Sequence, residues 1–245
     1  MQHRLAAAIL ALKKPTVIFM LNGGAVSIAP ELASHAAIVE CFYPGFEGAK
    51  AIARSLFGHA NRWGRMPYTT YHADWAAQNN MTQMDVAASN RTYRYGADAL
   101  VPFGAGQSLT QFNLSFAASG GADRLRTSCG ADASTMTVKV EVTNAGKLEG
   151  DEVVQLYLLP KAVDVPRHPV KALIDFARVR SLAPGATREL AFELRREALL
   201  LATEAGDLAC VPGQYELSVE DGAGERLTRK LTVTGPQAIV VPFPS

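Results

Sequence analysis

The sequence predicts an α/β portion followed by an all-β portion. In the first half, two apolar runs of strand length, 16–21 and 36–42, alternate with helix-forming segments. Runs that are apolar at successive positions are typical of parallel strands buried on both faces. Farther along, polar and apolar residues alternate, as in 137–142, which is the pattern of a half-buried antiparallel strand. Several such strands separated by Pro-Gly turns predict an antiparallel β-sandwich.

Three helices are expected in the first half. Residues 6–12 are strong helix formers that end before Pro15, and a shorter helix is predicted over 30–34. The clearest helix covers 47–57, because its apolar residues recur at the spacing of one helical face. These residues are Ala49, Ile52, Ala53, Leu56 and Phe57. From 58 to 112 the chain is rich in turn residues, and we expect mostly surface loop.

The second half divides from the first at a run of small residues. Strands are expected at 137–142, 153–158, 190–194, 214–219 and 229–233. The run 117–133 contains Gly120-Gly121 and is typical of a linker. The predicted boundaries are therefore 1–116 for the α/β portion, 117–134 for the linker, 135–236 for the β-sandwich and 237–245 for a tail.

The composition excludes several classes of protein. With a formal net charge of +1, the chain lacks the basic field that binding to nucleic acid requires, and no such partner is expected. No apolar run approaches the roughly 20 residues that span a bilayer, so no membrane partner is expected. His59 and His72 lack the spacing of metal ligands, and we predict neither a metal site nor a cofactor.

The three cysteines of the chain are Cys41, Cys129 and Cys210. They are widely spaced and odd in number, which indicates neither a disulfide framework nor a metal knuckle. We expect buried free thiols.

A series of motifs, taken in order, resembles the C-terminal half of glycoside hydrolase family 3. The first group consists of LNGGAVSI, CFYPGFEGAKAIARSLFG, NRWGRMPYT, NRTYRY and VPFGAGQSLTQF, and it is similar to the end of the family's α/β sandwich domain. The second group, VEVTNAGKLEGDEVVQLYL, HPVKALIDFARVRSLAPG and VPGQYELSV, is similar to the fibronectin type III-like domain that follows in many members. The resemblance thus implies an incomplete α/β sandwich domain plus a fibronectin type III-like antiparallel β-sandwich.

One motif also resembles a particular branch of this family. The stretch MTQMDVAASNRTYRY is similar to the β-xylosidase and arabinofuranosidase branch, although Asn90 stands where that branch usually has glycine. The implied substrates are oligosaccharides or glycosides with a terminal β-linked sugar, either a β-xyloside or a β-glucoside.

Three residues are candidate substrate contacts. Glu47 follows Tyr43-Pro44-Gly45 at the carboxyl end of a predicted strand, the edge at which open α/β sheets bind ligands. Its alternative role is to stabilise the first turn of the helix that it begins. Arg91 and Tyr93 could offer hydrogen bonds and an aromatic ring to a sugar, and their alternative role is packing or solvation.

The resemblance implies a retaining glycosidase whose catalytic carboxyl groups lie outside this chain. Such enzymes need two carboxyl groups about 5–5.5 Å apart, one as nucleophile and one as acid/base. The family places the nucleophilic aspartate in an N-terminal barrel domain and the acid/base glutamate in the earlier part of the sandwich domain, both upstream of Met1. We therefore assign no catalytic residue, expect the chain alone to be inactive, and expect a missing N-terminal barrel domain as its partner.

Two other interpretations of the chain stay open at this point. The β-sandwich could make it a non-catalytic carbohydrate-binding or interaction module, or the chain could be a truncated gene product. A sheet that lacks its first strands exposes an edge and apolar faces, so we predict poor solubility for the chain alone. Three glycosylation sequons, at Asn80, Asn90 and Asn113, fit a secreted parent protein.

Overall fold

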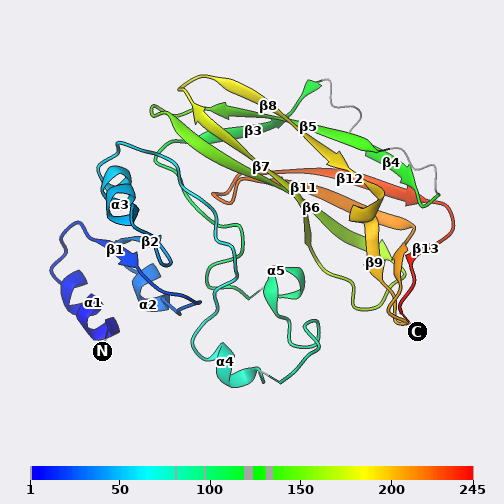
Figure 1. Ribbon diagram of the computed structural model, residues 1–245, viewed down its shortest axis with the longest axis horizontal. Coiled ribbons are helices and arrows are strands. Elements are labelled where there is room, and N and C mark those ends of the chain that lie inside the picture. Colours follow the sequence, from blue (N-terminus) through cyan, green and yellow to red (C-terminus); the bar gives the residue numbers. More distant parts are fainter. Residues whose placement is uncertain (1, 81, 97, 119–123, 131–134, 245) are drawn as a thin grey trace.

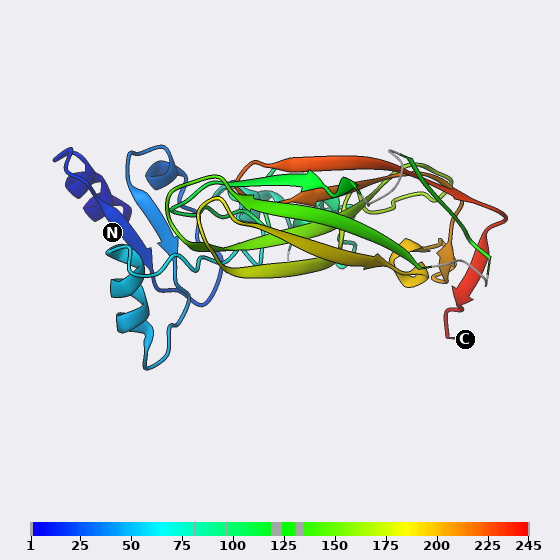
Figure 2. The same cartoon turned by 90° about the horizontal axis from the view of Figure 1, so that it is seen from above.

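The computed structural model describes residues 2–80, 82–96, 98–118, 124–130 and 135–244. A small α/β part that holds the N-terminus lies at one end of an elongated molecule, and the long strands of a β-sandwich extend away from it (Figures 1 and 2). A mostly irregular segment, 58–111, connects these two parts and runs along the sandwich.

The α/β part contains three helices and a parallel pair of strands. Its elements are α1 (Gln2–Leu10), β1 (Val17–Met20), α2 (Ala29–Leu32), β2 (Ala37–Glu40) and α3 (Gly48–Leu56). The strands pair in parallel from Val17 opposite Ala37 to Met20 opposite Glu40. These elements confirm the α/β character that the two apolar runs predicted.

The expectation that β1 and β2 are buried on both faces was wrong for this chain. Each strand has one exposed residue and three half-buried residues. The physical reason is that the described sheet has only these two strands, so both of its edges are open and few side chains cover its faces.

The segment 58–111 is mostly loop, as its turn residues indicated. It contains two one-turn helices, α4 (Trp75–Gln78) and α5 (Thr92–Tyr95). An isolated antiparallel bridge joins Thr70 to Val101 and closes the loop that lies between these two residues.

The sandwich is built from a five-stranded and a three-stranded sheet. Their strand orders are β4-β12-β11-β6-β7 and β3-β5-β8. The bounds are β3 (Phe112–Phe116), β4 (Arg124–Ser128), β5 (Met136–Asn144), β6 (Gly150–Val163), β7 (Ala172–Leu182), β8 (Thr187–Leu194), β11 (Gly213–Glu220) and β12 (Arg226–Thr234). A third small sheet has the order β13-β10-β9, with β9 (Leu200–Ala202) following the 3-10 helix η2 (Arg196–Leu199), β10 (Leu208–Cys210) and β13 (Ala238–Val241).

The core lies between the two larger sheets and follows the period of two. In β5 the buried residues are Val138, Val140, Val142 and Asn144, and the three valines belong to the same apolar cluster as Leu217 and Val219 of β11. The strand β6 differs, because it is buried at every position from Gly150 to Pro160. Its second face is covered by segment 58–111, so that segment packs as part of the sandwich.

Three strands lie outside the range 135–236 predicted for the sandwich and still pair with it. The strand β3, placed in the first domain, pairs with β5; β4, placed in the linker, pairs in parallel with β12; and β13, placed in the tail, pairs with β10. We therefore propose that the sandwich begins near residue 111 and continues to about residue 241.

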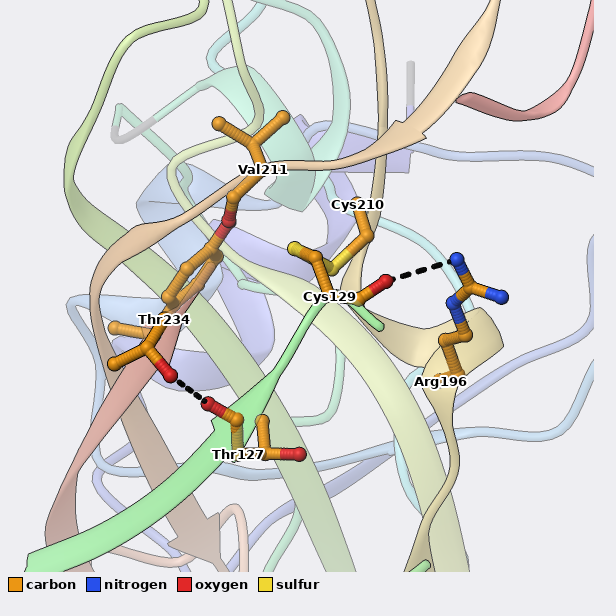
Figure 3. Close-up of a disulfide and its surroundings, with 7 residues drawn as sticks. Thr127, Cys129, Arg196, Cys210, Val211 and Thr234 are labelled. Carbon is orange, nitrogen blue, oxygen red and sulfur yellow. Dashed lines mark hydrogen bonds between the residues drawn. A yellow bond between two sulfur atoms is a disulfide. The ribbon is translucent and has the colours of Figure 1, made fainter. Parts of the chain in front are cut away.

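Cys129 and Cys210 form a disulfide, so the expectation of three free thiols was wrong. Their Cα atoms are 5.4 Å apart and both residues are fully buried. The backbone around Cys129, at the end of β4, is held by the N–H of Cys129 donating to the Thr234 carbonyl at 3.0 Å. Arg196 donates to the Cys129 carbonyl at 2.9 Å (Figure 3). The disulfide thus fastens β4 to the sandwich, while Cys41 remains a half-buried free thiol.

Candidate functional site

Glu47 lies apart from the other two predicted substrate contacts. It immediately precedes α3 but makes no capping hydrogen bond, and its exposed carboxylate forms an ion pair with Lys50 at 3.2 Å. Arg91 and Tyr93 lie at α5, which is well separated from α3 (Figure 1). The structure therefore does not bring the three residues into one site.

Arg91 and Tyr93 line a common pocket in segment 58–111. The pocket has a volume of about 300 Å³, and most of its wall is aromatic. The aromatic members are Tyr68, Tyr71, Trp75, Tyr93 and Phe103. The rings of Tyr71 and Trp75 stack at 4.1 Å, so these two side chains form one rigid platform.

The Arg91 side chain is anchored within its own loop. Its Nε donates to Ser89 Oγ at 2.8 Å, and its Nη2 donates to the Gln83 carbonyl. These two bonds hold the guanidinium at the wall of the pocket, and they use only some of its five N–H donors, so that others can bind a ligand.

The backbone on either side of Arg91 is in the left-handed region. Asn90 has φ of +47° and Thr92 has φ of +64°. Asparagine and glycine tolerate this region well, which explains why Asn90 can stand where the resembling branch has glycine. A β-branched threonine does not, and its backbone N–H is held by donating to the Tyr71 hydroxyl at 2.6 Å.

Tyr93 connects the pocket to the sandwich. Its ring stacks on Phe103 at 4.3 Å and meets the buried ring of Tyr157, in β6, edge to face at 6.1 Å. Its hydroxyl accepts a hydrogen bond from the N–H of Leu173, in β7, at 3.3 Å. The packing role that we weighed for Tyr93 is therefore present in the structure beside any contact with a sugar.

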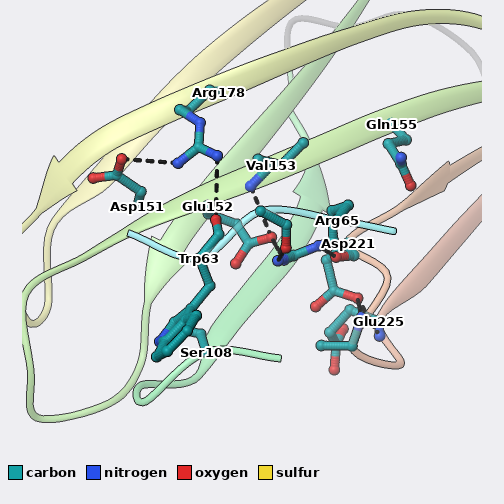
Figure 4. A network of polar contacts seen from close by, with 12 residues as sticks. Trp63, Arg65, Ser108, Asp151, Glu152, Val153, Gln155, Arg178, Asp221 and Glu225 are labelled. Atoms are coloured by element: carbon teal, nitrogen blue, oxygen red, sulfur yellow. Dashed lines mark hydrogen bonds and ion pairs between the residues drawn. The ribbon is translucent and has the colours of Figure 1, made fainter. Parts of the chain in front are cut away.

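A buried polar network joins the base of segment 58–111 to the sandwich (Figure 4). Arg65 forms an ion pair with Glu152 of β6, and these side chains are only 4% and 1% exposed. Arg65 Nε also donates to the Asp221 carbonyl in the β11–β12 turn. Beside it, Arg178 donates to Asp151 at 2.9 Å and to the Trp63 carbonyl at 3.2 Å.

Asn61 extends this network toward β3. Its side-chain Oδ1 accepts hydrogen bonds from Ser108 Oγ and from the N–H of Leu109, at 3.1 and 3.0 Å. Its backbone carbonyl accepts a hydrogen bond from the N–H of Asp151 at 2.9 Å. Asn61 is 7% exposed, and its side-chain Nδ2 donates to the Glu149 carbonyl at 3.4 Å, so both ends of the buried amide have partners.

Burial raises the pKa of Glu152 from 4.5 to about 7. This value is the net result of several effects: the nearby carboxylate of Asp221 also raises the pKa, whereas the charge and hydrogen bond of Arg65 and the hydrogen bond from the N–H of Val153 lower it. Burial is the largest of these effects, so the protonation state of Glu152 depends on pH near neutrality.

Sequence reasoning did not single out Arg65, Asn61 or Glu152. Each stands within a motif that carried the family resemblance, NRWGRMPYT for the first two and VEVTNAGKLEGDEVVQLYL for the third. A lone arginine in a loop and a glutamate 87 positions later share no local pattern. The signal that could have found them is the occurrence of charged or amide side chains inside otherwise apolar or turn-forming motifs.

Apolar surface gathers around the α/β part. An open groove of about 560 Å³ lies between α1, β1 and α2 and is lined mainly by apolar side chains. The residues Tyr43, Phe46 and Phe57, which flank α3, are also strongly exposed. Among the described residues, no group of three or more His, Cys, Asp or Glu is placed to hold a metal ion, and no helix there is long and apolar enough to cross a membrane.

Comparison with known families matches both parts of the chain. The glycosyl hydrolase family 3 C-terminal domain matches residues 1–109, and the fibronectin type III-like domain matches residues 152–223.

Relatives of this chain are much longer than the chain itself. A probable exo-1,4-beta-xylosidase of Aspergillus fumigatus is 32% identical over 94% of this chain and 32% of its own length. A xylan 1,4-beta-xylosidase of Xylanibacter ruminicola is 32% identical over 95% of this chain and 26% of its own length. The chain thus spans about a quarter to a third of these relatives.

Solved structures show the same fold. A family 3 exo-beta-xylosidase in complex with a xylobiose aziridine probe superposes with a TM-score of 0.85 at 24% identity, over 99% of this chain and 34% of that one. A beta-glucosidase from Listeria innocua in complex with glucose gives 0.77 at 25% identity, over 96% and 33%. The chain belongs to glycosyl hydrolase family 3, of which it forms a C-terminal part with a fibronectin type III-like domain.

Proposed function

We propose that this chain is the C-terminal, non-catalytic portion of a retaining β-glycosidase that hydrolyses terminal β-xylosides or β-glucosides. One observation carries the proposal: nearly the whole chain aligns, at 32% identity, with relatives named exo-1,4-beta-xylosidases. The chain spans only about a third of their length, so the catalytic carboxyl groups belong to the rest of the protein.

The pocket beside α5 is the proposed contribution of this chain to substrate binding. An aromatic platform and a cation at its wall suit a sugar ring, which has apolar faces and a hydroxylated rim. Arg91 and Tyr93 are the proposed contacts at this pocket. Glu47 is a proposed contact on a different surface, at the edge where β2 ends.

The proposed partner within the same protein is an N-terminal barrel domain. The open edges of the β1–β2 sheet, the groove beside α1 and the exposed rings of Tyr43, Phe46 and Phe57 offer it an apolar contact surface. Surfaces of this kind mark interaction sites in soluble proteins.

The disulfide and the sequons support an exported parent protein. Disulfides persist in oxidising compartments and are rare in the cytosol. The sequon residues Asn80, Asn90 and Asn113 are all exposed.

The experiment that tests the proposed function is to sequence the native transcript across the codon for Met1. We expect a longer reading frame that encodes a barrel domain and two carboxylate residues suited to a retaining mechanism. Translation that begins at Met1, demonstrated by the N-terminal sequence of the native protein, would contradict the proposal.

A further inference from the structure

The contacts of Arg65 connect three parts of the chain that are far apart in sequence. We infer that Arg65 is a positioning residue, which fixes the aromatic pocket beside α5 to the fibronectin type III-like sandwich. The inference rests on the proposed function only in that the pocket is expected to face a glycoside; the mechanical link itself is independent of activity.

A single guanidinium bridges two elements of the sandwich. Arg65 Nη2 pairs with Glu152 in β6, Nε donates to the Asp221 carbonyl in the β11–β12 turn, and Nη1 donates to the Gly64 carbonyl at 3.1 Å. Because the guanidinium of Arg65 is planar, its side chain can make these three hydrogen bonds together only in one orientation. The side chain is 4% exposed, so breaking these bonds leaves buried charge without a partner.

The backbone that follows Arg65 forms the wall of the pocket. The N–H of Met66 donates to the Ala105 carbonyl, the N–H of Gly104 donates to the Met66 carbonyl, and the N–H of Thr70 donates to the Val101 carbonyl, each at 2.8 Å. Tyr68 and Phe103, which line the pocket, lie in these two paired stretches. The ladder between 66–70 and 101–105 therefore begins at Arg65 and ends at the pocket.

The base of this ladder is so tightly packed that it leaves no room for the ladder to shift relative to the sandwich. A Cβ on Gly222 would lie 1.9 Å from the Gly104 carbonyl and 2.9 Å from Arg65 Cδ, and a Cβ on Gly104 would lie 2.5 Å from Gln155 Oε1. The N–H of Gly106 donates to the Gly222 carbonyl at 3.1 Å. The β11–β12 turn thus meets the ladder backbone against backbone, the ladder packs against the side chains of Gln155 and Tyr157 in β6, and Arg65 contacts both the turn and β6.

The competing explanation is that Arg65 simply stabilises the sandwich. The two explanations predict that different parts of the structure lose order when Arg65 is replaced. Neither the apolar core cluster nor the disulfide includes Arg65, so we expect both to hold the sandwich together without it. Loss of Arg65 should consequently loosen the ladder and the pocket while the core strands keep their protection.

The test uses the full 245-residue chain with Trp63→Phe, which leaves Trp75 as the single tryptophan because the chain has 2. Trp75 stacks on Tyr71 in the pocket and reports its order through acrylamide quenching. Amide hydrogen exchange at Met66, Thr70 and Gly104 reports how well the ladder is ordered, and exchange in β11 reports how well the sandwich is ordered.

The variants are Arg65→Met and Arg65→Lys. The matched control is Arg226→Met, which removes a 50% exposed arginine that pairs with Glu216 on the same sheet.

We expect Arg65→Met to raise the quenching constant of Trp75 about two-fold and to speed ladder exchange while β11 exchange stays unchanged. Arg65→Lys should give an intermediate effect, because lysine restores the charge without the planar guanidinium, and Arg226→Met should match the parent.

Unchanged quenching and ladder exchange in Arg65→Met would overturn the inference. Equal acceleration in β11 would also overturn it, by making Arg65 a stability residue of the sandwich. If Arg65→Met does not fold, the same criteria are applied to Arg65→Lys. None of these readouts depends on glycosidase activity.

Discussion

At the scale of single residues, glycines decide how closely segment 58–111 approaches the sandwich. Gly104 has φ of +84° and faces Gln155 and Tyr157 of β6, so both its conformation and its lack of a side chain are used. Gly185, in the turn between β7 and β8, has φ of +74° but nothing within 4 Å of a Cβ. Comparing substitutions at Gly104 and Gly185 therefore distinguishes the cost of backbone strain from the cost of a steric clash.

We predict that Gly104→Ala destabilises the chain by about 2–3 kcal/mol, because the added methyl group adds a steric clash to the strain. Gly185→Ala should cost about 1 kcal/mol, from strain alone. The free energy of unfolding in urea, followed by circular dichroism, measures both. Equal losses in the two variants would show that the approach of Gly104 to β6 is looser than described.

The pKa of Glu152 gives a second prediction at this scale. The folded-state pKa of about 7 lies above the ordinary value of 4.5, so between these pH values the unfolded chain loses a proton that the folded chain keeps. The free energy of unfolding should therefore fall as the pH rises from about 4.5 to about 7, by about 3 kcal/mol at most.

Glu152→Gln should remove this pH dependence, because glutamine cannot ionise and still offers an oxygen to Arg65. Urea unfolding at a series of pH values compares the two proteins. A glutamine variant with the same slope as the parent would assign the dependence to other groups.

At the scale of elements, the disulfide matters because it secures an edge strand. Within the described part of the chain, β4 is an edge strand that pairs with β12 alone, and the Cys129–Cys210 bond fixes the end of β4 across 81 positions of sequence. A cross-link that closes a loop of this length stabilises chiefly by restricting the unfolded chain.

Replacing Cys129 and Cys210 by serine should lower the free energy of unfolding by about 3–5 kcal/mol and speed amide exchange in β4. Cys41→Ser, which removes the half-buried free thiol, is the matched control and should change stability by no more than about 0.5 kcal/mol. A double variant as stable as the Cys41→Ser control would argue against a structural disulfide.

The same elements show what the sequence could predict and why the rest escaped. Strands with a clear period of two, such as β5 and β11, and the helix α3 with its apolar stripe were predicted close to their observed bounds. The strand β4, RLRTS, has a single apolar residue, Leu125, and β9 and β10 have three residues each, so none carries a periodic signal. Disulfide partners 81 positions apart are joined only by the tertiary fold.

The candidate site was predicted only in part. The sequence pointed to Arg91 and Tyr93 from a motif, and the structure places both at one pocket. It gave no sign of Trp75 on Tyr71 or of Arg65 against Glu152, because those contacts depend on how a loop folds onto the sandwich. Whether Glu47, Arg91 and Tyr93 contact a sugar stays a prediction.

At the scale of the whole molecule, the two ends differ in how well they cover their apolar residues. The sandwich encloses a large buried core, whereas the α/β part exposes Phe46 fully and Tyr43 and Phe57 by about three quarters. This contrast is expected if further protein normally covers the α/β part, and it underlies the predicted poor solubility of the chain alone.

We predict that Phe46→Ser together with Phe57→Ser makes the isolated chain less prone to aggregate, because it removes two large exposed rings. Phe176→Ser, which removes an exposed ring from β7 of the sandwich, is the control and should have little effect. Light scattering at increasing concentration follows the onset of aggregation. Similar improvement in both proteins would show that the α/β surface is not the principal adhesive face.

We propose that this chain serves as the C-terminal part of a family 3 β-glycosidase. The most direct test replaces the matching C-terminal part of the Xylanibacter xylan 1,4-beta-xylosidase by this chain and measures kcat/KM for an aryl β-xyloside. We predict hydrolysis well above that of the same relative without its C-terminal part, and a loss of most of that gain when Arg91 is replaced by alanine. A soluble, folded chimera no more active than the truncated relative would contradict the claim.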